Sequence, residues 1–201
     1  MSSTEGLIVF VFLFATVWAN SLIGTNDIAN WLIENTSTFI SLLFLLLTYK
    51  RYHFSDFSYF LICMFLCLHV YGSKYTYADN SFGFWLHEVL NSPRNEYERI
   101  VHFSFGFLLY YPMQECFSKW MGYSKPLANI LPITTTLAVG AVYEVIECIV
   151  ADKFFVNQGI AYLGTQGDTW DSQKDMAIAF LGVILATIFY YVYALFMNPR
   201  K

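Results

Sequence analysis

Long hydrophobic runs alternate with short polar segments along the whole chain. Most of these runs approach the roughly 20 apolar residues that a helix needs to cross a bilayer. Six of them can be placed, at residues 7–23, 31–49, 57–71, 98–120, 127–150 and 173–197. The pattern therefore predicts an all-α fold: a polytopic membrane helix bundle with about six transmembrane helices, forming a single domain over residues 1–201. Pro112 is expected to kink the fourth helix.

Composition supports lipid as the solvent of this fold. The chain is 57% hydrophobic and only 13% charged, whereas soluble domains carry about 25% charged residues. The formal net charge of -4 and the absence of a basic run exclude nucleic acid as an expected partner. The cysteines lie in or beside apolar runs, where unpaired Cys behaves as a small hydrophobe, so we predict packing rather than redox roles for them. They are Cys63, Cys67, Cys116 and Cys148. Nothing in the pattern specifies an oligomeric state.

The basic residues predict the orientation of the bundle. Six helices place both termini on one side of the membrane. On that side Lys and Arg lie tightly at helix ends in short loops, with few acids nearby, as the positive-inside rule expects of the cytoplasm. We therefore predict that both termini are cytoplasmic. The first hydrophobic run has no basic segment before it and no small-residue cleavage site after it, so we expect a retained helix rather than a signal peptide.

Polar and ionisable residues concentrate at one end of these helices. In an alternating topology, the ends that carry them all face the side opposite the termini. They are Glu34, Asn35, His69, Glu98, His102, Glu144, Glu147, Asp171 and Asp175. At the other ends we expect no buried acid or histidine. Because an ionisable group inside a bilayer costs a few kcal/mol, such a group is a functional candidate by default.

Helical spacing predicts which of these side chains share a face. Residues three or four apart lie on one side of a helix, which groups Glu98 with His102 and Glu144 with Glu147. Asp168, Asp171 and Asp175 follow a spacing of three and then four. The same stripe continues to Ala179 and Gly182, and such small residues let helices approach closely. The acidic stripe is therefore expected to face the interior of the bundle.

This combination of side chains has two chemical uses. Carboxylates with one or two imidazoles are ligands for divalent cations, and without a metal they can work as general acid and base. The candidate catalytic residues are His102, Glu144, Glu147, Asp171 and Asp175. The candidate ligands of a divalent metal ion are His102, Glu144, Glu147 and Asp175. A second group of candidates comprises His69, Asp168, Lys174, Tyr75 and Trp170.

Several of these residues also have plain structural interpretations. Ser172 and Asp175 fit a capping box that opens the last helix. Glu98 and Arg99 could be solvated at the surface. His69 and His102 could simply hydrogen-bond a backbone carbonyl or a tyrosine.

Two further features also have both a functional and a structural interpretation. Glu144 and Glu147 could form a salt bridge to Lys174 or Arg99. Gly164 and Gly167 are typical of backbone turns, although a phosphate-binding nest is a weaker alternative for them.

Four segments resemble the YjdF family of bacterial inner-membrane proteins. They are GTQGDTWDSQKDM at 164–176, HVYGSKYTY at 69–77, YERIVHF at 97–103 and YEVIE at 143–147. The resemblance covers most of the chain and implies a multi-pass protein of the bacterial inner membrane. The function of that family is unassigned, so the resemblance implies location and topology rather than chemistry.

A looser resemblance is to VanZ-like membrane proteins, which are linked to envelope processes. Glu98, Arg99 and His102 match an acid, base and histidine that open one helix of that pattern. A glutamate on the next helix is matched by Glu144 or Glu147. The pattern then has an Asp followed by Asn and Gly at four and seven residues on. Here Asp175 and Gly182 fit, but Ala179 replaces the Asn, which puts any Asn-dependent role in doubt.

Three functions follow from the sequence. The first is an envelope-facing enzyme that carries out hydrolysis or group transfer on a lipid or lipid-linked substrate, with or without a divalent metal. The second is a non-catalytic envelope or partner-binding protein whose polar residues form a structural network. The third is a binder or transporter of ions or small solutes, which the lack of an inverted repeat disfavours. Walker, haem and flavin signatures are absent.

Overall fold

The computed structural model describes residues 4–25, 27–75, 77–154 and 165–197, which form helices joined by turns and short loops. These ranges contain no β-strand, which confirms the predicted all-α class. The helices are α1 (Thr4–Leu22), α2 (Ile28–Glu34), α3 (Thr36–Tyr49), α4 (Asp56–Ser73), α5 (Ser81–Leu90), α6 (Tyr97–Glu115), the π-helical segment η1 (Cys116–Trp120), α7 (Lys125–Phe154) and α9 (Asp171–Met197).

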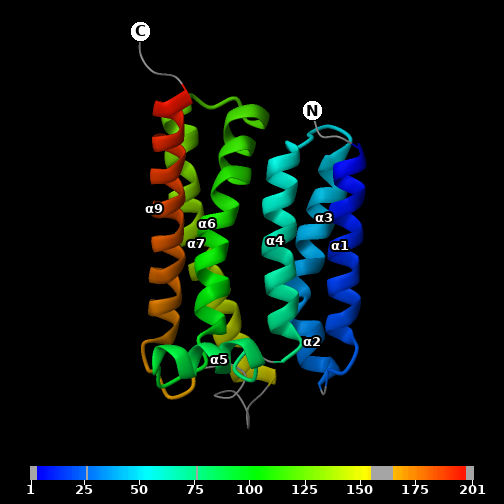
Figure 1. Cartoon of the computed structure of the whole chain (residues 1–201), viewed down its shortest axis with the longest axis vertical. Coiled ribbons are helices and arrows are strands. Elements are labelled where there is room, and N and C mark those ends of the chain that lie inside the picture. Colours follow the sequence, from blue (N-terminus) through cyan, green and yellow to red (C-terminus); the bar gives the residue numbers. More distant parts are fainter. Residues whose placement is uncertain (1–3, 26, 76, 155–164, 198–201) are drawn as a thin grey trace.

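The long helices run side by side in two halves (Figure 1). One half contains α1, α3 and α4, and the other contains α6, α7 and α9. Helix α6 joins the halves because it packs against both α9 and α4. Helix α1 begins and α9 ends at the same end of the bundle, which we call the terminal end (Figure 1). The opposite end, formed by α2, α5 and the first turns of α6 and α9, is called the distal end.

The observed helices match the six predicted ranges. Helices α1, α4, α7 and α9 are long and apolar enough to cross a membrane, and α2 with α3 would make a fifth span if the bent pair is one span. Helix α6 is less apolar than these spans because polar residues interrupt it, yet it runs alongside the other long helices (Figure 1). Two details differ from expectation. The second predicted helix is broken, and the fourth changes to π-helix four residues after Pro112.

The break between α2 and α3 is organised by Asn35. The two helices meet there at an angle of 43°. The fully buried Asn35 amide donates to the carbonyl of Trp31 at 2.8 Å and to Ser73 Oγ at 2.9 Å, and its oxygen accepts from the Trp18 indole at 2.8 Å. Asn side chains that bond nearby backbone compete with the helical ladder. Asn35 therefore links the junction of α2 and α3 to α1 through Trp18 and to α4 through Ser73.

Close contact between α6 and α9 depends on small residues. A Cβ atom at Gly106 would lie 2.0 Å from the carbonyl oxygen of Ala179, and one at Gly182 would lie 2.3 Å from that of Phe103. Backbone therefore lies directly on backbone at both positions. The predicted continuation of the acidic stripe into Ala179 and Gly182 as a close-packing surface is confirmed.

The terminal end contains a buried acid, so the expectation that it would hold none is wrong. Glu115, at the end of α6, is 1% exposed. Its carboxylate accepts from the backbone N–H of Ser55 at 3.1 Å, from Ser55 Oγ at 2.9 Å and from the hydroxyl of Ser58, and it pairs with Lys119 at 2.6 Å. The acid thus occupies the N-terminal end of α4, where unpaired N–H groups favour negative charge. The hydropathy pattern could not show this, because Ser55 and Ser58 lie 60 and 57 residues away in the sequence.

Replacing Glu115 with Ala should destabilise the protein by about 2–4 kcal/mol, because buried donors on Ser55 and Ser58 lose their acceptor. The measurement is the free energy of unfolding in mixed micelles. Lys119→Met is the control: the Lys119 side chain is 61% exposed, so its loss should cost less than about 1 kcal/mol. Equal stability of the two variants would show that Glu115 does not fasten α4 to α6.

Helix α5 lies in a connection for which we predicted no helix. Asn80 caps it by accepting from the N–H groups of Phe82 and Gly83 at 2.9 and 3.2 Å. Asn95 donates to the carbonyl of Asn80 at 2.8 Å, and it lies so close to Gly83 that a Cβ there would be 1.7 Å from its oxygen. These contacts hold α5 across the distal end (Figure 1). At ten residues the helix is too short to register as a span.

Candidate functional site

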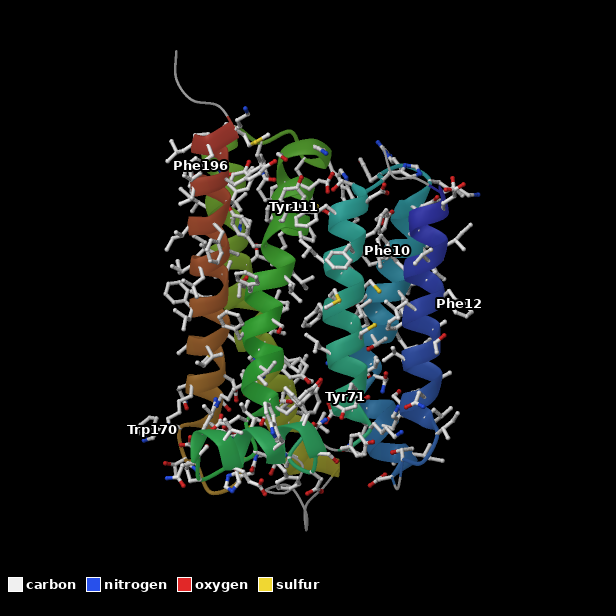
Figure 2. All side chains as sticks on the ribbon, viewed as in Figure 1. Phe10, Phe12, Tyr71, Tyr111, Trp170 and Phe196 are labelled. Carbon is white, nitrogen blue, oxygen red and sulfur yellow. The ribbon has the colours of Figure 1, made fainter. Side chains whose placement is uncertain are left out.

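The polar side chains of the bundle crowd the distal end. Figure 2 shows oxygen and nitrogen atoms concentrated there, at the level of Tyr71 and Trp170. Helices α6, α7 and α9 supply most of the ionisable groups, since α6 and α9 begin at this end and α7 finishes there. The alternating topology therefore brings together residues that are far apart in the sequence.

Two arginines bind the start of α6 to the start of α9. Arg99 contacts Asp171 at 2.6 Å and Asp175 at 2.7 Å, and it reaches Asp168 at 3.4 Å. Arg94 pairs with the same Asp171 and with Glu98, the latter at 2.8 Å. Asp171 therefore lies between two guanidinium groups. This geometry makes Asp171 the shared counter-ion of Arg94 and Arg99, and a catalytic role for Asp171 stays a prediction.

Burial excludes the surface interpretation of Glu98 and Arg99. Glu98 is 7% exposed, and the side chain of Arg99 is 11% exposed. Among the described residues, the ion pairs of Arg99 are to Asp168, Asp171 and Asp175. The salt bridge considered from Glu144 or Glu147 to Arg99 is therefore not observed. Lys174 likewise pairs with Asp168 instead, at 2.6 Å.

Three residues of the second predicted group organise the turn before α9. Asp168 accepts from Lys174 Nζ at 2.6 Å and from the N–H of Trp170 at 3.1 Å. The bond from Lys174, followed by that from Trp170, lowers the pKa of the Asp168 carboxyl. Trp170 itself is 65% exposed. Gly167 has a φ of 90°, which agrees with a turn, whereas Gly164 lies outside the described residues.

A carboxylate–histidine trio adjoins this arginine network and shares Glu98 and Asp175 with it. Glu98, His102 and Asp175 each place one ligand atom so that all lie within 4.8 Å of one another. His102 Nε2 is also 3.7 Å from Glu144 Oε1. That oxygen is buried without a hydrogen-bond partner among the described residues. Of the four predicted metal ligands, the structure brings His102 and Asp175 into this trio, with Glu98 in place of Glu144 and Glu147.

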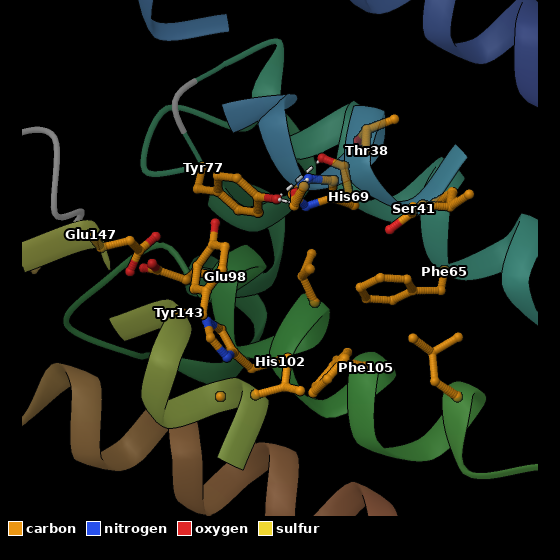
Figure 3. A pocket seen from close by; sticks show the side chains of 16 residues that line it. Thr38, Ser41, Phe65, His69, Tyr77, Glu98, His102, Phe105, Tyr143 and Glu147 are labelled. Carbon is orange, nitrogen blue, oxygen red and sulfur yellow. Dashed lines mark hydrogen bonds between the residues drawn. The ribbon is translucent and has the colours of Figure 1, made fainter. Parts of the chain in front are cut away.

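A cavity of about 180 Å³ opens beside the trio (Figure 3). It lies between α3, α4, α6 and α7. Glu98, His102 and Glu147 line one side of it, and His69 and Tyr77 lie across from them (Figure 3). The remaining lining is largely apolar and includes Phe65, Leu66, Val101, Phe105, Leu109 and Val139. Asp171, Asp175, Asp168, Lys174, Tyr75 and Trp170 do not line the cavity.

His69 is held in a buried hydrogen-bond chain at the cavity wall. Its Nδ1 lies 2.6 Å from the hydroxyl of Tyr77, and its Nε2 lies 2.8 Å from Ser37 Oγ and 3.1 Å from the carbonyl oxygen of Glu34. Burial raises the pKa of the Tyr77 phenol well above its usual value of 10, so the phenol keeps its proton. The structural interpretation of His69, bonded to a tyrosine and a backbone carbonyl, is what the geometry shows. Tyr75 packs against Tyr71, with ring centroids 5.6 Å apart, instead of joining this chain.

Carboxyl groups outnumber cationic side chains in this region. The carboxyl groups are Glu34, Glu98, Glu144, Glu147, Asp168, Asp171 and Asp175, and the cationic partners of the network are Arg94, Arg99 and Lys174. Buried carboxylates that crowd one another cannot all ionise without a counter-charge. The arrangement can therefore hold protons or a cation.

Sequence reasoning missed Arg94 and Thr38 as members of this region. Arg94 is four residues before Glu98, which is the spacing of a helical ion pair, so this signal was present in the sequence. The contact of Tyr77 with His69 was not predicted, because it depends on the turn after α4. In that turn Tyr77 has a φ of 49°.

Comparisons with known proteins agree with this architecture. The model of a family described as "Predicted membrane protein (DUF2238)" matches residues 6–195. Inner membrane protein YjdF of Escherichia coli (strain K12) is 35% identical over 169 residues, which cover 83% of this chain and 80% of that protein. No solved structure matches. The resemblance to the YjdF family is thereby confirmed, and the chain belongs to the DUF2238 family of multi-pass membrane proteins.

Proposed function

We propose that this protein is a membrane-embedded hydrolase or transferase that uses a divalent cation and acts on a lipid or lipid-linked substrate. One observation carries the proposal: the ligand atoms of Glu98, His102 and Asp175 converge within 4.8 Å beside a cavity. Two ligand atoms on opposite sides of a small divalent ion, each about 2.0–2.2 Å from it, are roughly 4.2 Å apart. The spacing of the three ligand atoms is therefore close to that of a divalent-cation site. A cation would also offset the excess of buried carboxylates.

The membrane position of the protein supports an outward-facing site. As a relative of an inner-membrane protein, the chain is placed by this proposal in the bacterial inner membrane. The basic residues at the terminal end favour the cytoplasm for both termini. On that assignment the distal end, with its cavity, faces the cell envelope.

The cavity supports an amphiphilic substrate. Its volume of about 180 Å³ is below the roughly 300–1,000 Å³ of pockets that enclose a whole drug-sized ligand. It therefore suits part of a larger molecule. Val139, which lines it, is 46% exposed. On this proposal an acyl or prenyl chain lies along the apolar lining while the polar part of the substrate reaches Glu98 and His102.

The proposed chemistry assigns distinct roles to the acids. A cation held by Glu98, His102 and Asp175 would supply Lewis acidity at this site. Glu144, whose Oε1 has no hydrogen-bond partner among the described residues, would accept the proton of the attacking water. The water oxygen forms a bond to the acyl or phosphoryl centre, and the bond from that centre to the leaving oxygen breaks. The proton held by Glu144 then passes to the leaving oxygen. In group transfer an acceptor hydroxyl takes the place of water.

Elemental analysis of detergent-purified protein, reloaded with Mn²⁺ or Zn²⁺ and then desalted, tests the proposal. We expect about one cation per chain in the wild type and at least a tenfold lower occupancy in Asp175→Asn and His102→Ala, because each removes one ligand. Glu115→Gln is the matched control, since it neutralises an equally buried acid at the other end of α6 and should keep its metal.

Activity on vesicles of bacterial phospholipids completes this test. Release of head groups or fatty acids should require the reloaded cation and should be lost in Glu144→Gln, which retains the trio. A folded wild type that binds no cation after reloading would overturn the proposal. So would full activity in the Asp175→Asn, His102→Ala and Glu144→Gln variants, and the distal carboxylates would then be a structural network.

A further inference from the structure

We infer that the first turn of α3 binds the phosphate of a phospholipid-type head group on the cavity wall opposite the carboxylate–histidine trio. The inference rests on the proposed function and names the substrate class of the same site. Ser37, Thr38 and Ser41 all belong to this turn or the next, and all three line the cavity. Figure 3 shows Thr38 and Ser41 on one side of the cavity and His102 and Phe105 on another.

The backbone at this place favours an anion. Helix α3 begins at Thr36, directly after the 43° break at Asn35. The side chain of Asn35 does not cap the new helix, because its amide is engaged with Trp31 and Ser73 and its oxygen with Trp18. The N-terminus of a helix carries partial positive charge and N–H groups in need of acceptors. Broken membrane helices present such ends to anionic substrate groups.

Thr38 supplies a second and independent observation. Its side chain is 0% exposed, it lines the cavity, and its hydroxyl has no hydrogen-bond partner among the described residues. A buried hydroxyl without a partner costs free energy. By contrast, the Ser37 hydroxyl is occupied by His69 and by the carbonyl of Glu34. The Thr38 hydroxyl is therefore left as a donor for a ligand, and Ser41, three residues further along α3, lines the same wall.

The two walls of the cavity complement a phosphate ester. A cation at Glu98, His102 and Asp175 would attract phosphate oxygens from one side, and the α3 terminus and Thr38 would bind them from the other. The apolar residues between the walls, such as Phe65 and Phe105, suit the chain of the same molecule. A water-soluble phosphate would gain nothing from that lining, so the geometry favours a lipid phosphate over a free one.

Titration calorimetry of the folded protein in an uncharged detergent tests this subsite, with dioctanoyl phosphatidic acid and inorganic phosphate as probes. Thr38→Val should weaken phosphatidic acid binding about tenfold, as expected for a lost hydrogen bond to a charged group. Thr136→Val is the matched control. Thr136 on α7 is also 0% exposed, and its hydroxyl has no partner in the described part of the chain, but it does not line the cavity. Its binding should be unchanged.

The outcomes separate this inference from the proposed function. Equal weakening in both threonine variants, or none in Thr38→Val, overturns the subsite even if the cation is bound. Inorganic phosphate that binds as tightly as phosphatidic acid overturns the lipid assignment. Loss of the cation in Asp175→Asn tests the trio alone. If Thr38→Val fails to fold, Ser41→Ala replaces it, and unchanged binding there also counts against the inference.

Discussion

Replacing Arg99 with Met should destabilise the protein by about 3–5 kcal/mol, which is the usual cost of leaving buried charges unpaired. Arg99 lies between the first turns of α6 and α9 and contacts Asp168, Asp171 and Asp175 at 3.4, 2.6 and 2.7 Å. Its side chain is only 11% exposed, so water cannot replace the lost contacts. Asp171 would keep Arg94, but Asp175 would lose the ion pair that offsets its burial.

Lys174→Met is the control for this prediction. Lys174 pairs with Asp168 at 2.6 Å, but its side chain is 56% exposed, so the loss of that pair should cost less than about 1 kcal/mol. Arg99→Lys should fall between the two variants, because an ammonium group cannot bridge three carboxylates as a planar guanidinium does. The measurement is the free energy of unfolding in mixed micelles, together with the size-exclusion elution profile of each variant. A similar stability for Arg99→Met and Lys174→Met would show that the arginine network does not hold the distal end together.

The second large effect is expected at the contact between α6 and α9. Gly106→Ala should lower the free energy of unfolding by about 1–3 kcal/mol, the usual cost of overpacking. The new methyl group would lie 2.0 Å from the carbonyl oxygen of Ala179 and 2.8 Å from the nitrogen of Val183. These are backbone atoms, which cannot rotate away as a side chain can. The helices must therefore separate, and the ion pairs at their first turns would be strained as well.

Gly140→Ala provides the matched comparison on a neighbouring helix. A Cβ at Gly140 would have one contact, 3.9 Å from Met176 Cγ, which is ordinary van der Waals distance. Since Ala also favours the helix over Gly by up to about 1 kcal/mol, this variant should be as stable as the wild type or slightly more so. If Gly106→Ala were equally harmless, α6 and α9 would not be in direct backbone contact.

Hydropathy was sufficient for the helical architecture, because each span is a local property of about 20 residues. The six predicted ranges correspond to the six long helical segments, and their ends differ by a few residues. What the pattern missed depends on side chains that bond across the structure. The break at Asn35 requires Trp18 and Ser73, and the short helix α5 requires Asn95. None of these three partners lies within the segment whose structure it decides.

The sequence alone determined that the distal end would concentrate acids and histidines, because alternating topology and helical spacing follow from the chain itself. It also indicated the small-residue stripe through Ala179 and Gly182. Only the tertiary structure decided how these groups are shared. Arg94 and Arg99 engage Asp171, Glu98 joins His102 and Asp175, and Glu115 forms a separate buried site at the terminal end. The physical reason is that an ion pair or a ligand set is a relation between atoms a few ångströms apart, and residues as distant in sequence as 94 and 171 acquire that relation only when α6 packs against α9.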